Sequence, residues 1–319
     1  MQEVDSSCVF SVSVIIAAFS MKRWNILCEA VTSVQAQTVP VLETVVVIDH
    51  NPELLAQARR AFPTNTVIAN DGKRGASGAR NAGVAASCGD LVAFLDDDAV
   101  ASPRWLEALL VHFGDSSVVG VGGRLDPRWE TSRPRWFPPE FDWVVGASYL
   151  GMPNRAEAVR NVWSNNMAIR RKVFDSIDGF RDDFGKVGAR SRPEDTDLCL
   201  RAAQWNGSGT WIYEPTASAA HQVPAERTTV RYFFYRCFNE GWGKAALAAL
   251  NGMGKSISAE RLYTRQVLPA ALARNLREAF CGKRPAACLR IFAIGAGFIV
   301  VMVGFFVGHL ALAIQGSGQ

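Results

Sequence analysis

Three consecutive carboxylates, Asp96, Asp97 and Asp98, directly follow the apolar run Leu91–Leu95. Such a run predicts a strand that is buried on both faces, and open α/β sheets bind ligands at the carboxyl ends of their strands. Adjacent carboxylates repel one another unless a cation neutralises them, and hard divalent cations prefer oxygen ligands. The pattern therefore indicates a divalent cation held together with a diphosphate. An acidic turn before the helix that starts near Ser102 is the alternative.

Two further polar positions are expected at the same edge of the sheet. Asp49 ends the apolar run Val45–Ile48, where it can bind a nucleobase or ribose, or cap the helix that begins at Pro52. The glycine-rich segment 72–81 leads into a helix whose N-terminus favours anions. Arg80 in this helix can face phosphates or pair with the acidic edge. The segment lacks the spacing of a P-loop.

A second acidic group, Glu194 and Asp195, follows Pro193 at the expected start of a helix. Acids in a first helical turn stabilise the helix dipole, and one of them can also act as a general base towards a hydroxyl group. His221 follows a stretch of small residues. Its imidazole can be structural, or it can join a divalent-metal site or contact a phosphate.

The elements that must position these residues alternate in the first half of the chain. Helical patterns near 22–37, 52–61 and 77–86 separate short β-branched runs at 12–16, 45–48, 67–68 and 91–95. This alternation predicts a doubly wound α/β domain with a mostly parallel sheet. Residues 124–153 are irregular and aromatic, residues 226–265 form an amphipathic helical pattern, and residues 266–290 predict a basic helix.

Composition narrows the class of protein. The chain has 319 residues, of which 49% are hydrophobic and 20% charged, and this excludes a disordered or collagen-like chain. The net charge of +4 does not by itself imply nucleic-acid binding, and we expect no nucleic-acid partner. Seven cysteines without a C-x-x-C pair predict free thiols in a reducing compartment.

One segment near the C-terminus is long and apolar enough to cross a bilayer. Ile291–Ile314 contains no Asp, Glu, Lys or Arg, and as a helix it would extend about 36 Å, against a hydrocarbon core of about 30 Å. Basic residues precede it, which predicts a single pass with the N-terminal body in the cytoplasm. Gly304 and Gly308 form a G-x-x-x-G pattern that can pack helices. The apolar run 9–19 follows acidic residues, so we expect a strand there and no secretory signal.

Taken in order, the runs VSVIIAAFS, VVVID, GASGARNAG, FLDDD and EDTDL, followed by His221, resemble family 2 glycosyltransferases with the GT-A fold. The resemblance covers roughly residues 10–225 and extends to glucosyl-dolichyl-phosphate glucuronosyltransferase-like and bacterial exopolysaccharide transferases. It implies an inverting transfer from a nucleotide-diphosphate sugar, with a UDP-sugar as the expected donor and Mn²⁺ or Mg²⁺ as the metal. The expected domains are a catalytic domain at 1–225, a basic helical segment at 226–290 and a transmembrane helix at 291–314.

The resemblance also assigns roles to residues of this chain. It implies that Asp195 is the catalytic base, with Glu194 beside it. The implied nucleotide-sugar contacts are Ala17, Phe19, Asp49, Arg80, Asp96 and Asp97, and the implied metal ligands are Asp98 and His221. The family's usual Pro-Thr-Tyr-Asn is replaced here by residues 17–20, Ala-Ala-Phe-Ser, and its Asp-Gly-Ser by residues 50–52, His-Asn-Pro. Both departures fall where the nucleobase is expected to bind.

The acceptor is expected to be a membrane-associated glycan or a polyprenyl-linked sugar, because the predicted anchor holds the protein at a membrane. Trp143, Trp163, Asn165 and Asn166 are expected to flank its site, since aromatic faces suit sugar rings. Two alternatives stay open at this point. One is a nucleotidyltransferase, which would release pyrophosphate. The other is a non-catalytic, membrane-anchored subunit that binds a nucleotide-sugar or a glycan.

Overall fold

The computed structural model describes residues 10–187, 190–282 and 284–316. Contacts between residues divide the chain into two compact units, each built from several segments. The first contains residues up to 124, 153–185 and 194–220, and the second contains 125–152, 186–193 and the residues from 221 onward. The aromatic segment, residues 125–152, therefore packs in one unit with the C-terminal helices, whereas the sequence places it within the catalytic domain.

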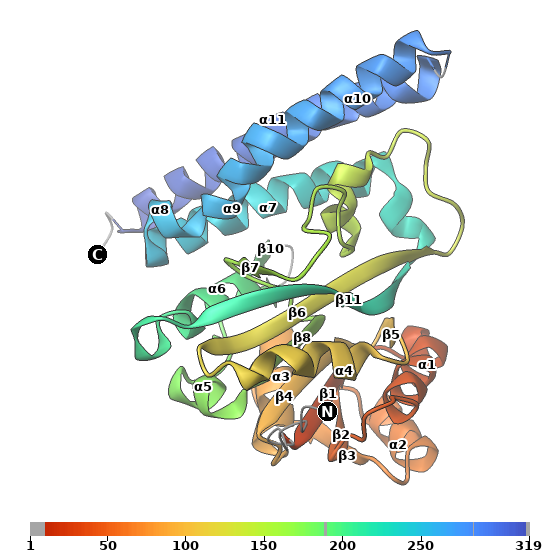
Figure 1. Cartoon of the computed structure of the whole chain (residues 1–319), viewed down its shortest axis with the longest axis vertical. Helices are drawn as coiled ribbons and strands as arrows, with labels where there is room; N and C mark the ends of the chain where they lie inside the picture. Colours follow the sequence, from red (N-terminus) through yellow and green to blue (C-terminus); the bar gives the residue numbers. More distant parts are fainter. Residues whose placement is uncertain (1–9, 188–189, 283, 317–319) are drawn as a thin grey trace, which may run out of the picture. The chain divides into compact units, whose positions relative to one another are not determined.

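The first unit is organised around a mixed nine-stranded sheet (Figure 1) with the order β3-β2-β1-β4-β8-β6-β11-β5, and β7 pairs with β11. Strands β3, β2, β1 and β4 are parallel, whereas β8 is antiparallel to both β4 and β6. The predicted α/β sheet is thus confirmed. Its parallel part is formed by the first four strands of the chain. The strands are β1 Val12–Ala18, β2 Glu43–Asp49, β3 Thr66–Asn70, β4 Leu91–Asp96, β5 Ala99–Ala101, β6 Val118–Trp129, β7 Glu157–Val159, β8 Asn166–Arg170 and β11 Thr210–Val223.

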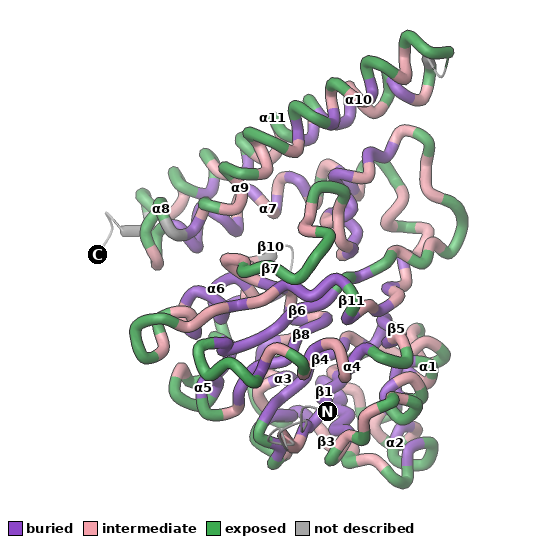
Figure 2. The backbone as a smooth tube through the Cα atoms, in the orientation of Figure 1, coloured by how far each residue is buried: buried purple, intermediate pink, exposed green. Residues whose placement is uncertain are grey.

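One face of this sheet is covered closely by helices. Ile15, Val47 and Phe94 pack with residues of α3, α5 and α6 in one buried cluster, and β4 and β8 at the centre of the sheet are buried along almost their whole length (Figure 2). A Cβ added at Gly83 of α3 would lie 2.4 Å from Ile15 Cγ2, so glycine permits the helix to approach β1. The helices are α1 Trp24–Gln35, α2 Pro52–Ala61, α3 Ala76–Ala85, α4 Trp105–Leu110, α5 Arg171–Ser176 and α6 Glu194–Ala202, with 3-10 turns η1 Met21–Arg23, η2 Val111–Gly114 and η4 Trp205–Gly207.

The second unit is helical and has its own aromatic core. The Phe233 ring meets Phe137 edge-to-face and lies tilted against Phe141, and Ile294 belongs to the same buried cluster. Its elements are η3 Pro139–Val145, η5 Ala225–Thr228, α7 Val230–Asn251, α8 Met253–Ser256, α9 Ser258–Leu262, the π-helix η6 Tyr263–Val267, α10 Leu268–Phe280 and α11 Arg284–Gly316. The short strands β9 Gly185–Val187 and β10 Arg190–Arg192 pair with each other.

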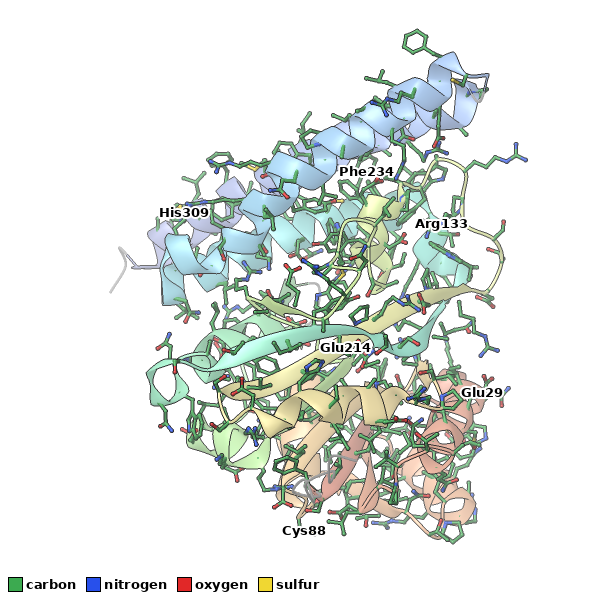
Figure 3. The ribbon with its side chains drawn as sticks, in the orientation of Figure 1. Glu29, Cys88, Arg133, Glu214, Phe234 and His309 are labelled. Atoms are coloured by element: carbon green, nitrogen blue, oxygen red, sulfur yellow. The ribbon has the colours of Figure 1, made fainter. Side chains whose placement is uncertain are left out.

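Helix α11 contains the apolar segment that the sequence singles out. It is long and apolar enough to cross a membrane, and residues 285–314 meet that test by length and composition. His309, near its C-terminal end (Figure 3), stacks on Phe305 with 6.2 Å between ring centroids. The glycines of the G-x-x-x-G pattern pack within this chain: a Cβ at Gly304 would lie 2.1 Å from the Phe238 carbonyl oxygen of α7.

Candidate active site

The carboxyl ends of the four parallel strands are level with one another. The register pairs Ala17 of β1 with Asp96 of β4, and Asp49 of β2 with Asn70 of β3. Ligands of open α/β sheets bind at this edge. The structure therefore brings together three of the positions that the sequence predicts for the site, Ala17, Asp49 and Asp96.

Arg80 joins the acidic edge to the start of α6. Its Nη2 donates to Asp96 Oδ1 at 2.7 Å, its Nη1 lies 3.4 Å from Glu194 Oε1, and its guanidinium stacks on the Phe180 ring. The side chain is 6% exposed. Burial disfavours the charge of Arg80, but Asp96 and Glu194 outweigh this effect and raise its pKa above the ordinary value. Through these contacts, the Arg80 guanidinium holds the carboxylates of Asp96 and Glu194 in position.

Arg23 pairs with the other two acids, Asp97 and Asp98. The sequence patterns did not indicate this role. Arg23 Nη1 lies 2.6 Å from Asp97 Oδ1 and its Nη2 lies 3.0 Å from Asp98 Oδ2. Asp97 is almost fully buried, and this burial raises the pKa of its carboxyl group to about 7 despite the adjacent Arg23. The position of Arg23 could have indicated this role, because Arg23 lies only five residues after the carboxyl end of the first strand.

Asp49 holds the loops at this edge in place. Its Oδ1 accepts a hydrogen bond from Asn70 Nδ2 at 2.7 Å and its Oδ2 accepts one from the Gly75 backbone N–H at 3.0 Å. His50 Nδ1 lies 3.0 Å from Oδ1. Asp49 thereby joins the ends of β2 and β3 to the loop before α3, and the cap of α2 is Asn51 instead.

Phe19 offers an exposed aromatic ring beside these groups. The residue is 54% exposed at the end of β1, and its ring lies 5.2 Å from the Arg23 guanidinium carbon. Its backbone oxygen accepts a hydrogen bond from Asn51 Nδ2, which fixes the loop. An exposed ring on a fixed loop can stack on a planar base.

Asp195 lies in the first turn of α6 and is half-buried. Its Oδ1 accepts a hydrogen bond from the Thr196 backbone N–H at 2.7 Å. The neighbouring acids are committed elsewhere, since Glu194 pairs with Arg80 and the fully buried Asp197 pairs with Arg201. The role of Asp195 as catalytic base stays a prediction.

The segment at 163–166 approaches the acidic edge through its backbone. The Asp96 N–H donates to the Asn165 carbonyl at 3.4 Å, and Trp163 accepts from the Asn166 N–H. Asn166 is 1% exposed, and its amide is bonded to Trp105 Nε1 and to two backbone oxygens. This geometry gives Asn166 a structural role inside the sheet, and its expected place in the acceptor site stays a prediction.

Two predicted site residues belong to the second unit. His221 is 2% exposed, and its ring contacts Gly146 closely enough that an added Cβ would lie 3.0 Å from Cε1. Trp143 packs against Phe141, and its Nε1 donates to the Tyr263 hydroxyl at 3.3 Å. Their roles in metal and acceptor binding stay predictions.

The acidic edge offers a limited set of metal ligands. Within the described part of the chain, no group of three or more His, Cys, Asp or Glu side chains could hold a metal ion. Asp96 at the end of β4 and Asp98 in the turn after it carry carboxylate oxygens, and these groups also pair with Arg80 and Arg23. Mg²⁺ is commonly held by one or two carboxylates together with substrate phosphates. The donor set therefore fits a divalent cation whose remaining ligands come from a diphosphate.

Comparisons with known proteins identify relatives of this chain. Residues 13–178 match the model of glycosyl transferase family 2. The chain is 34% identical over 244 residues to the glucosyl-dolichyl phosphate glucuronosyltransferase of Haloferax volcanii, covering 75% of this chain and 78% of that protein. It is 27% identical over 271 residues to the succinoglycan biosynthesis protein ExoM of Rhizobium meliloti, covering 82% and 81%.

Solved structures share the fold. A mannosyltransferase from Pyrobaculum calidifontis in complex with GDP-Man and Mn²⁺ aligns with a TM-score of 0.61 at 18% identity, covering 94% of this chain and 87% of that one. GalNAc-T7 with UDP, GalNAc and Mn²⁺ aligns with a TM-score of 0.54 at 15% identity, covering 75% and 51%. These likenesses identify the sheet as GT-A-like.

Proposed function

Because this chain belongs to glycosyltransferase family 2, we propose that it transfers a hexosyl or glucuronosyl group from a UDP-sugar to a hydroxyl of a lipid-linked glycan. The observation that carries the proposal is the presence of an acidic edge at the end of β4, together with a half-buried carboxylate, Asp195, at a helix start. The relative from Haloferax volcanii is named as a glucosyl-dolichyl phosphate glucuronosyltransferase, which supports a glucuronosyl group and a lipid-linked acceptor.

In this proposal, residues at the edge of the sheet bind the nucleotide-sugar donor and the metal. Phe19 stacks on the base of the donor, and the loop fixed by Asp49 orients it. Asp96 and Asp98 would hold Mn²⁺ or Mg²⁺, which when bound supplies positive charge to the departing nucleoside diphosphate. Arg80 keeps the Asp96 carboxylate in place by its 2.7 Å hydrogen bond.

Asp195 takes the proton from the acceptor hydroxyl. The hydroxyl oxygen forms the new glycosidic bond at the anomeric carbon while the bond to the diphosphate oxygen breaks, and the electron pair leaves with the nucleoside diphosphate. One displacement from the opposite face inverts the configuration, so no enzyme nucleophile is required. General-base catalysis of this kind contributes roughly 10²–10⁴ to the rate.

The test compares Asp195→Asn with the parent protein. We expect transfer to fall by at least about 100-fold, while the thermal shift caused by UDP-sugar and Mn²⁺ is retained. Asp175→Asn is the matched control, because Asp175 is exposed on α5. Full transfer activity in Asp195→Asn would remove this residue from the mechanism. Release of pyrophosphate instead of nucleoside diphosphate would identify a nucleotidyltransferase and overturn the proposal.

A further inference from the structure

Helix α11 has one face that is exposed and entirely apolar. Phe292, Ile299, Phe306, Leu310 and Ile314 are each between 60% and 72% exposed. Their spacings of seven, seven, four and four residues place them on a single side of the helix. Figure 2 shows this exposed side along α11. An apolar stripe of this length on a water-facing surface is strongly unfavourable, which indicates an apolar surrounding.

Helix α10 also exposes apolar side chains, and η6 and α10 add positive charge. Leu276 and Phe280 are exposed at 48% and 81%, one turn apart near the end of the helix. Arg265 and Arg277 are also exposed. Long cationic side chains can place their stems along lipid and their charges at the headgroups. The arrangement matches a surface helix at an anionic bilayer.

The opposite face of α11 packs tightly on α7. A Cβ at Gly297 would lie 2.9 Å from the Phe141 ring, one at Gly304 would lie 2.1 Å from the Phe238 carbonyl, and one at Gly308 would lie 3.0 Å from Ala245. From α7, a Cβ at Gly241 would lie 1.9 Å from the Val301 carbonyl. Any movement of α11 into a membrane would therefore carry residues 233–245 of α7 with it.

That part of α7 carries charge. Lys244 is 7% exposed, and its Nζ lies 2.8 Å from Glu260 Oε1 and 3.4 Å from Glu240 Oε1. Lys244 is adjacent to Ala245 in the sequence, Glu240 is adjacent to Gly241, and both Ala245 and Gly241 contact α11. If α11 crossed the bilayer, this ionic group would be carried to the depth of the hydrocarbon core. Charged side chains there cost roughly 2.5–3.5 kcal/mol each on insertion scales.

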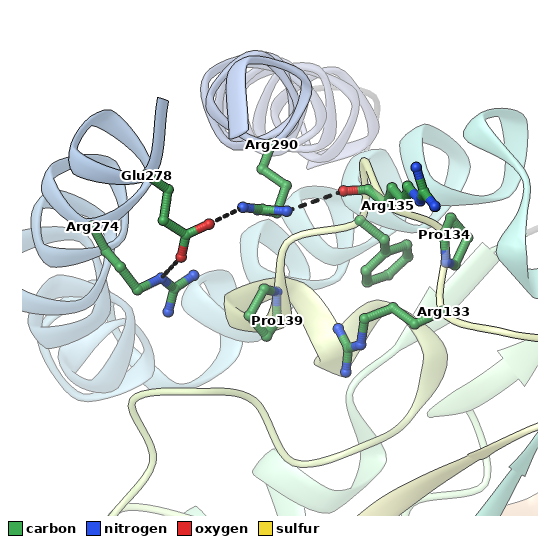
Figure 4. Close-up of a pocket in the computed structure, with 8 residues that line it drawn as sticks. Arg133, Pro134, Arg135, Pro139, Arg274, Glu278 and Arg290 are labelled. Carbon is green, nitrogen blue, oxygen red and sulfur yellow. Dashed lines mark hydrogen bonds and ion pairs between the residues drawn. The ribbon is translucent and has the colours of Figure 1, made fainter. Parts of the chain in front are cut away.

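The first turns of α11 are bound to charged groups as well (Figure 4). Arg290 pairs with Glu278 of α10 and its Nε donates to Asn275 Oδ1 at 2.6 Å. Arg274 pairs with Glu140 at 2.8 Å. Arg274, Glu278 and Arg290 also line an open cavity of about 430 Å³. Charged or polar groups of α10 and α7 thus lie beside α11 from its first turns to its middle.

We propose that α10 and α11 lie in the plane of one leaflet as a monotopic anchor, with the apolar stripe of α11 in lipid and with Arg265 of η6 and Arg277 of α10 at the headgroups. In this orientation, α7 and the charged groups of α10 and α11 face water, and only the apolar stripe enters the acyl chains. The occupant of the surface is an anionic lipid bilayer. This arrangement replaces the single membrane crossing that length and composition predict.

Topology provides the first test. The full chain would carry one epitope before Met1 and another after Gln319, and it would be reconstituted into sealed vesicles of phosphatidylglycerol and phosphatidylcholine. The in-plane anchor predicts that protease removes both epitopes from the same side of the membrane. Protection of one epitope until the vesicles are opened with detergent would show a crossing and overturn the proposal.

A surface variant provides the second test. The double variant Leu276→Glu/Phe280→Glu is expected to reduce flotation with the same vesicles by at least about tenfold, because its apolar contact and charge complementarity are both lost. Both side chains are exposed, so the fold should be retained. Val111→Glu is the matched control, since Val111 is 69% exposed in the first unit. Unchanged flotation of the double variant would contradict the in-plane anchor.

Discussion

The contact of Arg80 with two acids leads to a quantitative prediction for Arg80→Gln. Removing one partner of a buried ion pair costs roughly 3–5 kcal/mol. The Asp96 and Glu194 side chains are 29% and 19% exposed, so water will compensate for part of the loss. We therefore expect the lower end, about 3 kcal/mol. At roughly 2–4 °C per kcal/mol, the melting temperature should fall by about 6–12 °C.

A double-mutant cycle with Asp96→Asn tests whether this loss comes from the pair. Urea unfolding followed by tryptophan fluorescence would give the free energy of unfolding for both single variants and the double variant. Because Arg80 Nη2 and Asp96 Oδ1 are 2.7 Å apart, we expect a coupling energy of about 1–3 kcal/mol. Donor binding should also weaken in Arg80→Gln, because the Asp96 carboxylate is no longer held.

The exposed pair Arg104 and Glu107 provides a matched cycle. Its side chains are 76% and 42% exposed at a distance of 2.8 Å. Water screens the charges of an exposed pair, so this cycle should show little coupling. If the energies of Arg80→Gln and Asp96→Asn instead add to within about 0.5 kcal/mol, Arg80 does not position Asp96 and the argument for its role fails.

Three further outcomes test other parts of the site and fold. Asp98→Asn, or EDTA with the parent protein, should abolish the thermal shift that UDP-sugar and Mn²⁺ produce; an undiminished shift in both cases would exclude a metal-bridged donor. Gly83→Ala should lower the free energy of unfolding by about 1–3 kcal/mol, because the new Cβ would lie 2.4 Å from Ile15 Cγ2, whereas Gly114→Ala meets nothing within 4 Å and should change it little. Asn166→Ala should cost about 1–3 kcal/mol for each buried partner left unsatisfied, measured by urea unfolding, and a neutral result would contradict its structural role.

Much of the site was predictable from local patterns. Apolar runs of four or five residues identify parallel strands, and parallel strands bring their carboxyl ends to one edge, so Asp49 and Asp96 could be grouped without coordinates. The position of Asp195 in a first helical turn followed from Pro193 and the acids after it. These are properties of neighbouring residues, which is why the sequence contains them.

The pairings between distant residues could not be predicted in this way. Arg23 is 74 positions from Asp97, and Arg80 is 114 positions from Glu194. Each arginine could equally have faced solvent or a phosphate, because a single basic residue does not specify its partner. The same limit applies to α11, whose composition predicts a membrane crossing while its glycine face depends on the position of α7.

The aromatic core of the second unit also has a consequence for biosynthesis. Phe137 and Phe141 are made early, but Ile294, which completes their cluster, follows about 150 residues later. At about 5–20 residues per second, the ribosome needs roughly 8–30 seconds to cover that interval. During this time the aromatic rings lack their final covering helix. The second unit can therefore close only late in translation, and until then its rings are a target for chaperones.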